Sequence, residues 1–338
     1  MYIGFYNYYN IYNNNKMFTD PLSPIGDNLM APFVSLGKYL RASGHSFNTI
    51  DVEQNIFKFD AVIFIEFPTL KNIYYRKLVK NNYKNLYLII LEPEIINKEN
   101  WKIENHKYFK KIFTFHDDFI DNKKYYKINY CFKKPENLNF DISVKKKLCA
   151  MIVGNKYKKY PGELYTERLK AIRWFEENHP EDFDLYGFGW NKYLFTNKYY
   201  FLNEVKIFKR LFKPNFPSYK GTIKSKNETL KKYKFSICYE NVKDISGYIT
   251  EKIFDCFFAG CVPVYLGAPN IKKYIPKNTF INKNLFKNYS ELYDYMSNLE
   301  LSDYKKYLEN IKYFVTSEKF NSFSIDYFIQ NIIGEIKI

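Results

Sequence analysis

Short apolar runs alternate with segments of helical spacing along the chain, and this alternation restricts its fold more than any other feature. In the first half, Leu29, Phe33, Leu36 and Leu40 share one helical face, and Gly44 is placed to end that helix. Strand-like runs are predicted at residues 2–5, 47–50, 61–66, 86–91 and 111–115. Strands that alternate with helices favour a parallel sheet covered by helices.

A second alternation begins after a polar stretch, residues 132–147, which contains Pro135, ends in a lysine triplet and is expected to be a linker. Predicted elements follow at residues 149–153 (strand), 163–178 (helix) and 184–186 (strand), whereas residues 191–225 have no clear period and stay unassigned. A chain of 338 residues exceeds what one core usually serves. We therefore expect an α/β protein with two Rossmann-like domains, residues 1–140 and 141–338, facing across a cleft.

The segment from residue 233 to residue 276 predicts a βαβ unit with polar residues at its strand ends. Its elements are a strand at residues 235–239, a helix at residues 253–259 closed by Gly260, and a strand at residues 262–266. Parallel strands end at the same edge of a sheet. Glu240 and Asn241 after the first strand, and Gly267 and Ala268 after the second, are therefore expected to line one crevice.

The start of the predicted helix has features of an anion site. Thr250 can cap the helix, and the unpaired N–H groups of a first turn suit a phosphate. Lys252 lies in that turn, where the helix dipole disfavours a cation unless an anion is present. The alternative is an ordinary helix start with a solvated Lys252. Polar residues that converge on the same edge favour the binding interpretation.

The order of motifs in this half resembles the α-1,3-fucosyltransferases, glycosyltransferase family 10. The motifs are YEN (239–241), GYITEKIFD (247–255), CVPVYLGAPN (261–270) and IPKNTFI (275–281), and the likeness extends back through FDLYGFGW (183–190), ELYTERLKAIRWF (163–175), KINY (127–130), FTFHDD (113–118) and LEPEIINKENW (91–101). The resemblance implies a fold of the GT-B type, with the acceptor bound mainly by residues 1–140 and the GDP-sugar mainly by residues 141–338. It also implies inverting transfer of L-fucose from GDP-β-L-fucose, without a metal or other cofactor, to an acceptor oligosaccharide. The expected acceptor is a hydroxyl of a glycan that contains N-acetylglucosamine, with an α-1,3 linkage.

The resemblance also assigns donor-binding residues, which are Arg168, Glu240, Asn241, Tyr248, Glu251 and Lys252. Without a metal, cationic side chains must offset the charge that develops on the departing GDP. Arg168 can do so with a bidentate guanidinium and Lys252 as a point charge. The alternative for Arg168 is an exposed helical arginine, which is the interpretation given to Arg173 five residues on.

The family places its general base on the residue that corresponds to Glu92. Glu92 follows the predicted strand at residues 86–91 and precedes Pro93, which favours an extended conformation at the strand end. Direct displacement requires one carboxylate to accept the proton of the acceptor hydroxyl. Glu94, two residues on, is the competing candidate, and a solvated glutamate is the alternative for both.

Other classes of function are weaker alternatives. A related GT-B enzyme could use another nucleotide sugar, since diphosphate sites look alike. The formal charge of +16 suits nucleic acid or an anionic membrane, but only five basic residues are arginine, so we expect no nucleic-acid partner. No CxxC pair indicates a zinc site. No signal peptide or membrane anchor is recognisable, which predicts a cytoplasmic protein and leaves peripheral membrane association and oligomeric state open.

Overall fold

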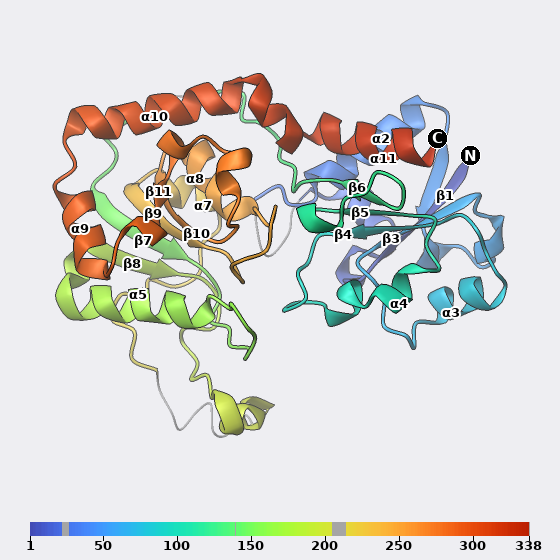
Figure 1. Ribbon diagram of the computed structural model, residues 1–338, viewed down its shortest axis with the longest axis horizontal. Helices are drawn as coiled ribbons and strands as arrows, with labels where there is room; N and C mark the ends of the chain where they lie inside the picture. Colours follow the sequence, from blue (N-terminus) through green and yellow to red (C-terminus); the bar gives the residue numbers. More distant parts are fainter. Residues whose placement is uncertain (22–26, 139, 205–213, 338) are drawn as a thin grey trace. The chain divides into compact units, whose positions relative to one another are not determined.

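A computed structural model of the chain describes residues 1–21, 27–138, 140–204 and 214–337. The chain divides into two compact units, each built around its own parallel sheet (Figure 1). The first unit comprises Met1–Lys133, Ser246–Tyr248 and Phe320–Ile338. The second comprises Lys134–Ile245 and Ile249–Lys319.

The first unit contains a six-stranded sheet in the order β2-β1-β3-β4-β5-β6, in which every neighbouring pair is parallel. Its strands are β1 (Tyr2–Asn7), β2 (Ser46–Thr49), β3 (Ala61–Ile65), β4 (Leu86–Ile90), β5 (Lys111–Thr114) and β6 (Tyr125–Lys127). Its helices are α1 (Lys16–Thr19), α2 (Ala31–Ala42), α3 (Ile73–Lys80), α4 (Ile103–His106) and α11 (Ile325–Ile336).

Both faces of this sheet are buried, because successive side chains of a strand point to opposite faces. On β3, Ile63 packs in a cluster with residues of α2 and α11. Val62 and Phe64 pack in a second cluster with Tyr75 and Leu78 of α3. The continuous apolar runs of the sequence are therefore strands covered on both sides.

The structure divides the chain differently from the expected boundary between residues 140 and 141. The chain leaves the first unit after Lys133, and its last part, Phe320–Ile338, returns to that unit. The reason is the apolar face of α11, where Phe328 packs edge-on against Phe33 of α2 with ring centroids 5.9 Å apart. A helix distant in sequence thus completes the first core.

The second unit contains a five-stranded parallel sheet in the order β11-β10-β9-β7-β8. Its strands are β7 (Lys147–Ile152), β8 (Phe183–Tyr186), β9 (Tyr233–Tyr239), β10 (Val262–Leu266) and β11 (Ile281–Asn282). Its helices are α5 (Tyr165–Asn178), α7 (Lys226–Leu230), α8 (Glu251–Ala259), α9 (Tyr289–Ser297) and α10 (Leu301–Thr316). The expected βαβ unit is the succession β9, α8, β10.

The glycines predicted to end helices do so in the expected conformation. Gly260, directly after α8, has φ +63°, and Gly44, two residues after α2, has φ +76°. Both values lie in the left-handed region that favours glycine. Of the unassigned stretch at residues 191–225, a 3-10 helix at Asn197–Glu204 is described, and residues 205–213 lie outside the described part.

None of the helices described is long and apolar enough to cross a membrane. The longest, α10, has 16 residues, and a spanning helix needs about 20 apolar ones.

Candidate active site

The buried carboxylate of Glu240, directly after β9, organises the loop that enters α8. Its Oε1 accepts a hydrogen bond from the backbone N–H of Thr250 (2.9 Å), and its Oε2 accepts one from the Thr250 hydroxyl (2.7 Å). The same Oε2 forms an ion pair with Lys252 Nζ at 3.0 Å. Glu240 has no exposed surface, so it orients Thr250 and Lys252 and does not contact a ligand itself.

Thr250 is the residue before α8, as the sequence predicts, but its hydroxyl does not cap the helix. It donates to Glu240 instead, because a buried carboxylate without donors would be costly. The first N–H groups of α8 therefore have no threonine cap, and the first turn of any helix offers N–H groups without an acceptor inside the helix.

Lys252 and Glu251 form a charged cluster in the first turn of α8. Burial opposes the charged form of Lys252, but the carboxylates of Glu240 and Glu251 outweigh it and raise the pKa of the ammonium group. Desolvation likewise opposes ionisation of Glu251, yet Lys252 and then Lys226 hold its pKa at about 2. Lys226 also forms an ion pair with Asp255, with 2.7 Å between Nζ and Oδ2. Glu251 and Lys252, two of the predicted donor-binding residues, are thus both charged at neutral pH.

Arg168 is not the exposed helical arginine of the alternative interpretation, because only 3% of its surface is exposed. It lies in the first turn of α5, and its Nη2 donates to the carbonyl oxygen of Tyr239 (2.6 Å) and to Asn241 Oδ1 (3.1 Å). The backbone carbonyl oxygen of Asn241 accepts a hydrogen bond from the backbone N–H of Leu164, just before α5. Arg168, Glu240, Asn241, Glu251 and Lys252 therefore come together at the carboxyl end of β9.

Tyr248 belongs to the first unit and not to this cluster. Its ring is buried against Phe115 (5.1 Å between centroids) and Tyr130 (6.4 Å). The preceding Gly247 has φ +82°, and an added Cβ would lie 2.3 Å from the carbonyl oxygen of Phe115. Only glycine allows the chain to approach so closely, which fixes the aromatic packing of Tyr248.

Glu92, the predicted general base, lies in the first unit just after β4 and is partly exposed. Tyr9 donates its hydroxyl hydrogen toward Glu92 Oε1 at 3.4 Å. The carbonyl oxygen of Glu92 accepts hydrogen bonds from Asn100 Nδ2 and Trp101 Nε1, both at 3.1 Å. The competing candidate, Glu94, is also partly exposed. These contacts fix the backbone of Glu92 and leave its side chain accessible.

A second carboxylate, Glu66, interacts with Glu92, and the sequence predicts it as the last residue of a strand. β3 ends at Ile65, and Glu66 has φ +65°, a strained value for a residue with a side chain. Its Oε1 accepts the backbone N–H groups of Leu91 (2.8 Å) and Glu92 (3.1 Å), and its Oε2 accepts from Asn100. Glu66 is 2% exposed. It therefore joins the ends of β3 and β4.

The two carboxylates affect each other. Burial, and then the charge of Glu92, raise the pKa of Glu66 to about 8, against the lowering effect of its hydrogen bonds from Asn100 and the backbone. At neutral pH Glu66 therefore favours its protonated, neutral form. A glutamate at the end of an apolar run was the one signal in the sequence that could have indicated Glu66, because buried glutamates need partners.

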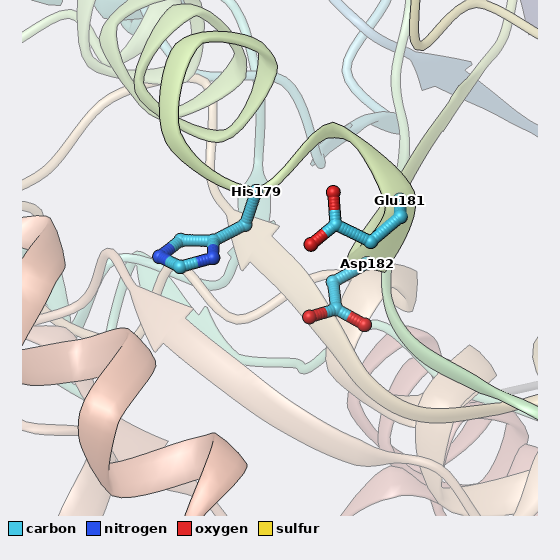
Figure 2. Close-up of side chains that lie close together, drawn as sticks. All are labelled: His179, Glu181 and Asp182. Carbon is cyan, nitrogen blue, oxygen red and sulfur yellow. The ribbon is translucent and has the colours of Figure 1, made fainter.

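One group of described residues has the composition of a metal site. His179, Glu181 and Asp182 lie on the turn between α5 and β8, with their side chains close together (Figure 2). Asp182 already accepts a hydrogen bond from the Tyr293 hydroxyl (2.6 Å), and the His179 ring stacks on Tyr293 at 3.5 Å. The turn precedes β8, at the amino ends of the parallel strands. It therefore lies at the opposite sheet edge from Arg168 and Lys252.

Comparison with protein families gives one match that covers most of the second unit. The profile of glycosyltransferase family 10 (fucosyltransferase), C-terminal part, matches residues 142–327, more than half of the chain. The α-(1,3)-fucosyltransferase FucT of Helicobacter pylori is 43% identical over 77 residues, which are 23% of this chain and 16% of that enzyme. The mouse enzyme 4-galactosyl-N-acetylglucosaminide 3-α-L-fucosyltransferase 9 is 40% identical over 84 residues, 24% of this chain and 22% of the enzyme. The matches thus span less than a quarter of these relatives.

Solved structures share the architecture of the whole chain. A crystal structure of an α1,3-fucosyltransferase matches with a TM-score of 0.60 and 16% identity, over 100% of this chain and 90% of the other. Anabaena HepE in complex with UDP matches with a TM-score of 0.58 and 11% identity, over 100% of both chains. Likenesses at such low identity concern the fold, and they confirm the predicted GT-B class with two parallel α/β domains. The profile match over more than half of the chain shows that it belongs to glycosyltransferase family 10, the fucosyltransferases.

Proposed function

We propose that the protein transfers L-fucose from GDP-β-L-fucose, with inversion, to a hydroxyl of an acceptor glycan. One observation carries the proposal: the segment that matches the fucosyltransferase family, residues 142–327, contains Arg168 and Lys252, both placed at the carboxyl end of β9. In open parallel sheets this edge is where ligands bind. The family, the fold and the position of the cations thus agree on a nucleotide-sugar donor.

The second unit supplies cations for the diphosphate of the donor. Arg168 is held by the Tyr239 carbonyl and Asn241, which places its guanidinium at the edge where the diphosphate of the donor would bind. Lys252 is oriented by Glu240, and Glu251 balances its charge. The N–H groups of the first turn of α8 add a favourable dipole. Negative charge that develops on the departing GDP would be stabilised by these groups without a divalent metal.

The first unit supplies the general base. Glu92 would accept the proton of the acceptor hydroxyl while the oxygen of that hydroxyl forms the bond to fucose and the bond between fucose and GDP breaks. Attack from the face opposite the leaving group gives the inverted product. Glu66 acts as a positioning residue, because it binds the backbone N–H groups of Leu91 and Glu92. An acceptor that contains N-acetylglucosamine, joined by an α-1,3 linkage, is our proposal from the family alone.

The test is a donor screen with linkage analysis. The purified protein is incubated with N-acetyllactosamine and, in turn, GDP-fucose, GDP-mannose and UDP-sugars, each with and without EDTA. We expect turnover with GDP-fucose only, retained in EDTA, and an α-configured fucose in the product by NMR. Turnover only with another nucleotide sugar would assign the protein to a different GT-B activity. Loss in EDTA that added metal restores would contradict the metal-free mechanism.

A further inference from the structure

The first unit carries a depression on its surface that the proposed reaction does not use. It has a volume of about 640 Å³ and lies between α3 and the segment around α4. Its lining includes Leu70, Ile73, Arg76, Lys77, Lys80, Glu104, Lys107 and Tyr108. We call it the α3–α4 groove. Two features of its lining matter here: exposed apolar side chains and a row of basic ones.

The apolar side chains of the groove are exposed. Ile73 is 60% exposed, Leu70 is 54% exposed and Tyr108 is 39% exposed. Single exposed apolar residues are common on soluble proteins. Three large ones gathered in one depression can enter an apolar environment together, as contact with a membrane or a partner requires. Ile103, at the start of α4, is a further exposed apolar side chain at 51%.

The basic part lies along one face of α3. Ile73, Arg76, Lys77 and Lys80 have the spacing of a single helical face, while Leu78 lies in the core on the other side. In the part of the chain that the structure describes, no ion pair involves Arg76, Lys77 or Lys80. The same holds for Lys107. Glu104 is the one acidic residue of the groove lining. The groove therefore presents positive charge that the protein does not neutralise.

Exposed apolar side chains beside unpaired cations fit one kind of surface. In a phospholipid bilayer, exposed leucine and isoleucine side chains can insert at the boundary between headgroups and acyl chains. Anionic headgroups attract lysine and arginine side chains beside them. The long basic side chains can lie along the apolar surface and place their charges at the headgroups. A nucleic acid would use the cations but not Leu70 and Ile73, and a neutral glycan would leave the cations without a partner.

We propose that the α3–α4 groove docks the protein on an anionic phospholipid bilayer as a peripheral protein. The inference is independent of the donor assignment, since it involves neither Glu92 nor any residue of the second unit. Docking would hold the first unit, the proposed acceptor-binding half, at the bilayer surface. It would be reversible and sensitive to salt, because it combines a small apolar contact with electrostatic attraction.

The experiment is sedimentation of the full chain with vesicles of phosphatidylcholine alone or with 30% phosphatidylserine. The basic variant is R76Q/K77Q/K80Q, and the apolar variant is L70S/I73S. The matched control, K277Q/K305Q/K312Q, removes three exposed cations of the second unit. Circular dichroism and thermal unfolding verify that each variant folds.

We expect the wild type and the control to sediment with the anionic vesicles only. The basic variant should bind on the order of a hundredfold more weakly, and the apolar variant should also lose binding. The proposal fails if the wild type does not bind anionic vesicles, or if the control loses as much affinity as the basic variant. It also fails if the apolar variant binds as well as the wild type. Tight binding of a single-stranded RNA that the basic variant abolishes and the apolar variant retains would assign the groove to nucleic acid.

Discussion

Each unit holds a buried glutamate directly after a central strand, but the two glutamates have opposite neighbours. Glu240, after β9, pairs with the cation of Lys252. Glu66, after β3, lies beside another carboxylate, Glu92, and its described bonds come from neutral N–H groups. The first arrangement stabilises separated charges and suits the binding of a diphosphate. The second resists full ionisation and suits a group that takes up a proton. The difference matches the division of labour that we propose.

The largest expected effect comes from removing the cation that Glu240 needs. Lys252→Met should lower the free energy of unfolding by about 3 to 5 kcal/mol, because it leaves a buried carboxylate without its partner. Urea unfolding followed by circular dichroism measures the loss. The double variant Glu240→Gln/Lys252→Met should recover a large part of it, and a double variant as unstable as the single one would show that the pair is not coupled.

The next effect concerns Glu92. Glu92→Gln keeps the shape and the hydrogen bonds of the side chain but cannot accept a proton, so fucose transfer should fall about 10²-fold or more while GDP affinity stays near that of the wild type. Transfer rates and GDP titration calorimetry measure the two functions separately. Glu94→Gln is the control and should change transfer little. An inactive Glu94→Gln with an active Glu92→Gln would move the base by two residues.

A smaller effect is expected at Arg168. Arg168→Ala removes charge-assisted contacts to the diphosphate that contribute about 1.5 to 3 kcal/mol, so GDP should bind about 10- to 150-fold more weakly. Arg173 offers a matched control on the same helix, because it pairs with Glu176 and packs on Phe216. Equal losses of GDP affinity in Arg168→Ala and Arg173→Ala, measured by calorimetry, would indicate damage to α5 and not a lost ligand contact.

The most subtle difference lies in the response to pH. Glu66 has a pKa raised from 4.5 to about 8, so the stability that it contributes is complete below pH 4.5 and is lost as the pH rises toward 8. Glu251 has a pKa lowered from 4.5 to about 2, so its contribution is present above pH 4.5 and is lost as the pH falls toward 2.

Two variants separate these responses in urea unfolding. Relative to the wild type, Glu66→Gln should gain stability between pH 5 and pH 8. Glu251→Gln should be less stable than the wild type at pH 6, and the gap should narrow at pH 3. If both variants follow the wild type in parallel over these ranges, neither carboxyl titrates differently in the folded and unfolded states.

Local patterns in the sequence were sufficient to predict most of the fold. The runs that become β3, β4 and β10 are apolar throughout, and Gly44 and Gly260 follow helices where a left-handed residue is required. The return of residues 320–338 to the first unit could not be predicted, since it depends on packing between α11 and α2 across almost the whole chain. Amphipathic spacing identifies a helix but not the surface that it covers.

The polar site was predictable in its location but not in its internal partners. Parallel strands place their ends together, which brought Glu240, Asn241 and Lys252 to one edge as expected, whereas Arg168 on α5 was assigned from the family resemblance. Whether Thr250 caps a helix or binds Glu240 depends on three-dimensional neighbours that no spacing reveals. The left-handed backbone conformation of Glu66 could not be predicted from the sequence either. It accompanies hydrogen bonds from the backbone at the end of β4 to the Glu66 carboxylate.

The position of α11 has a consequence for how the chain acquires its structure during synthesis. The ribosome delivers residues 1–133 first, yet the helix that covers one face of their sheet follows only after the whole second unit. Until then, the apolar surface of α2 and β1 beneath α11 remains without its cover. The nascent amino-terminal part therefore stays incomplete while the second unit folds, and during that interval it is the part most exposed to aggregation and to chaperones.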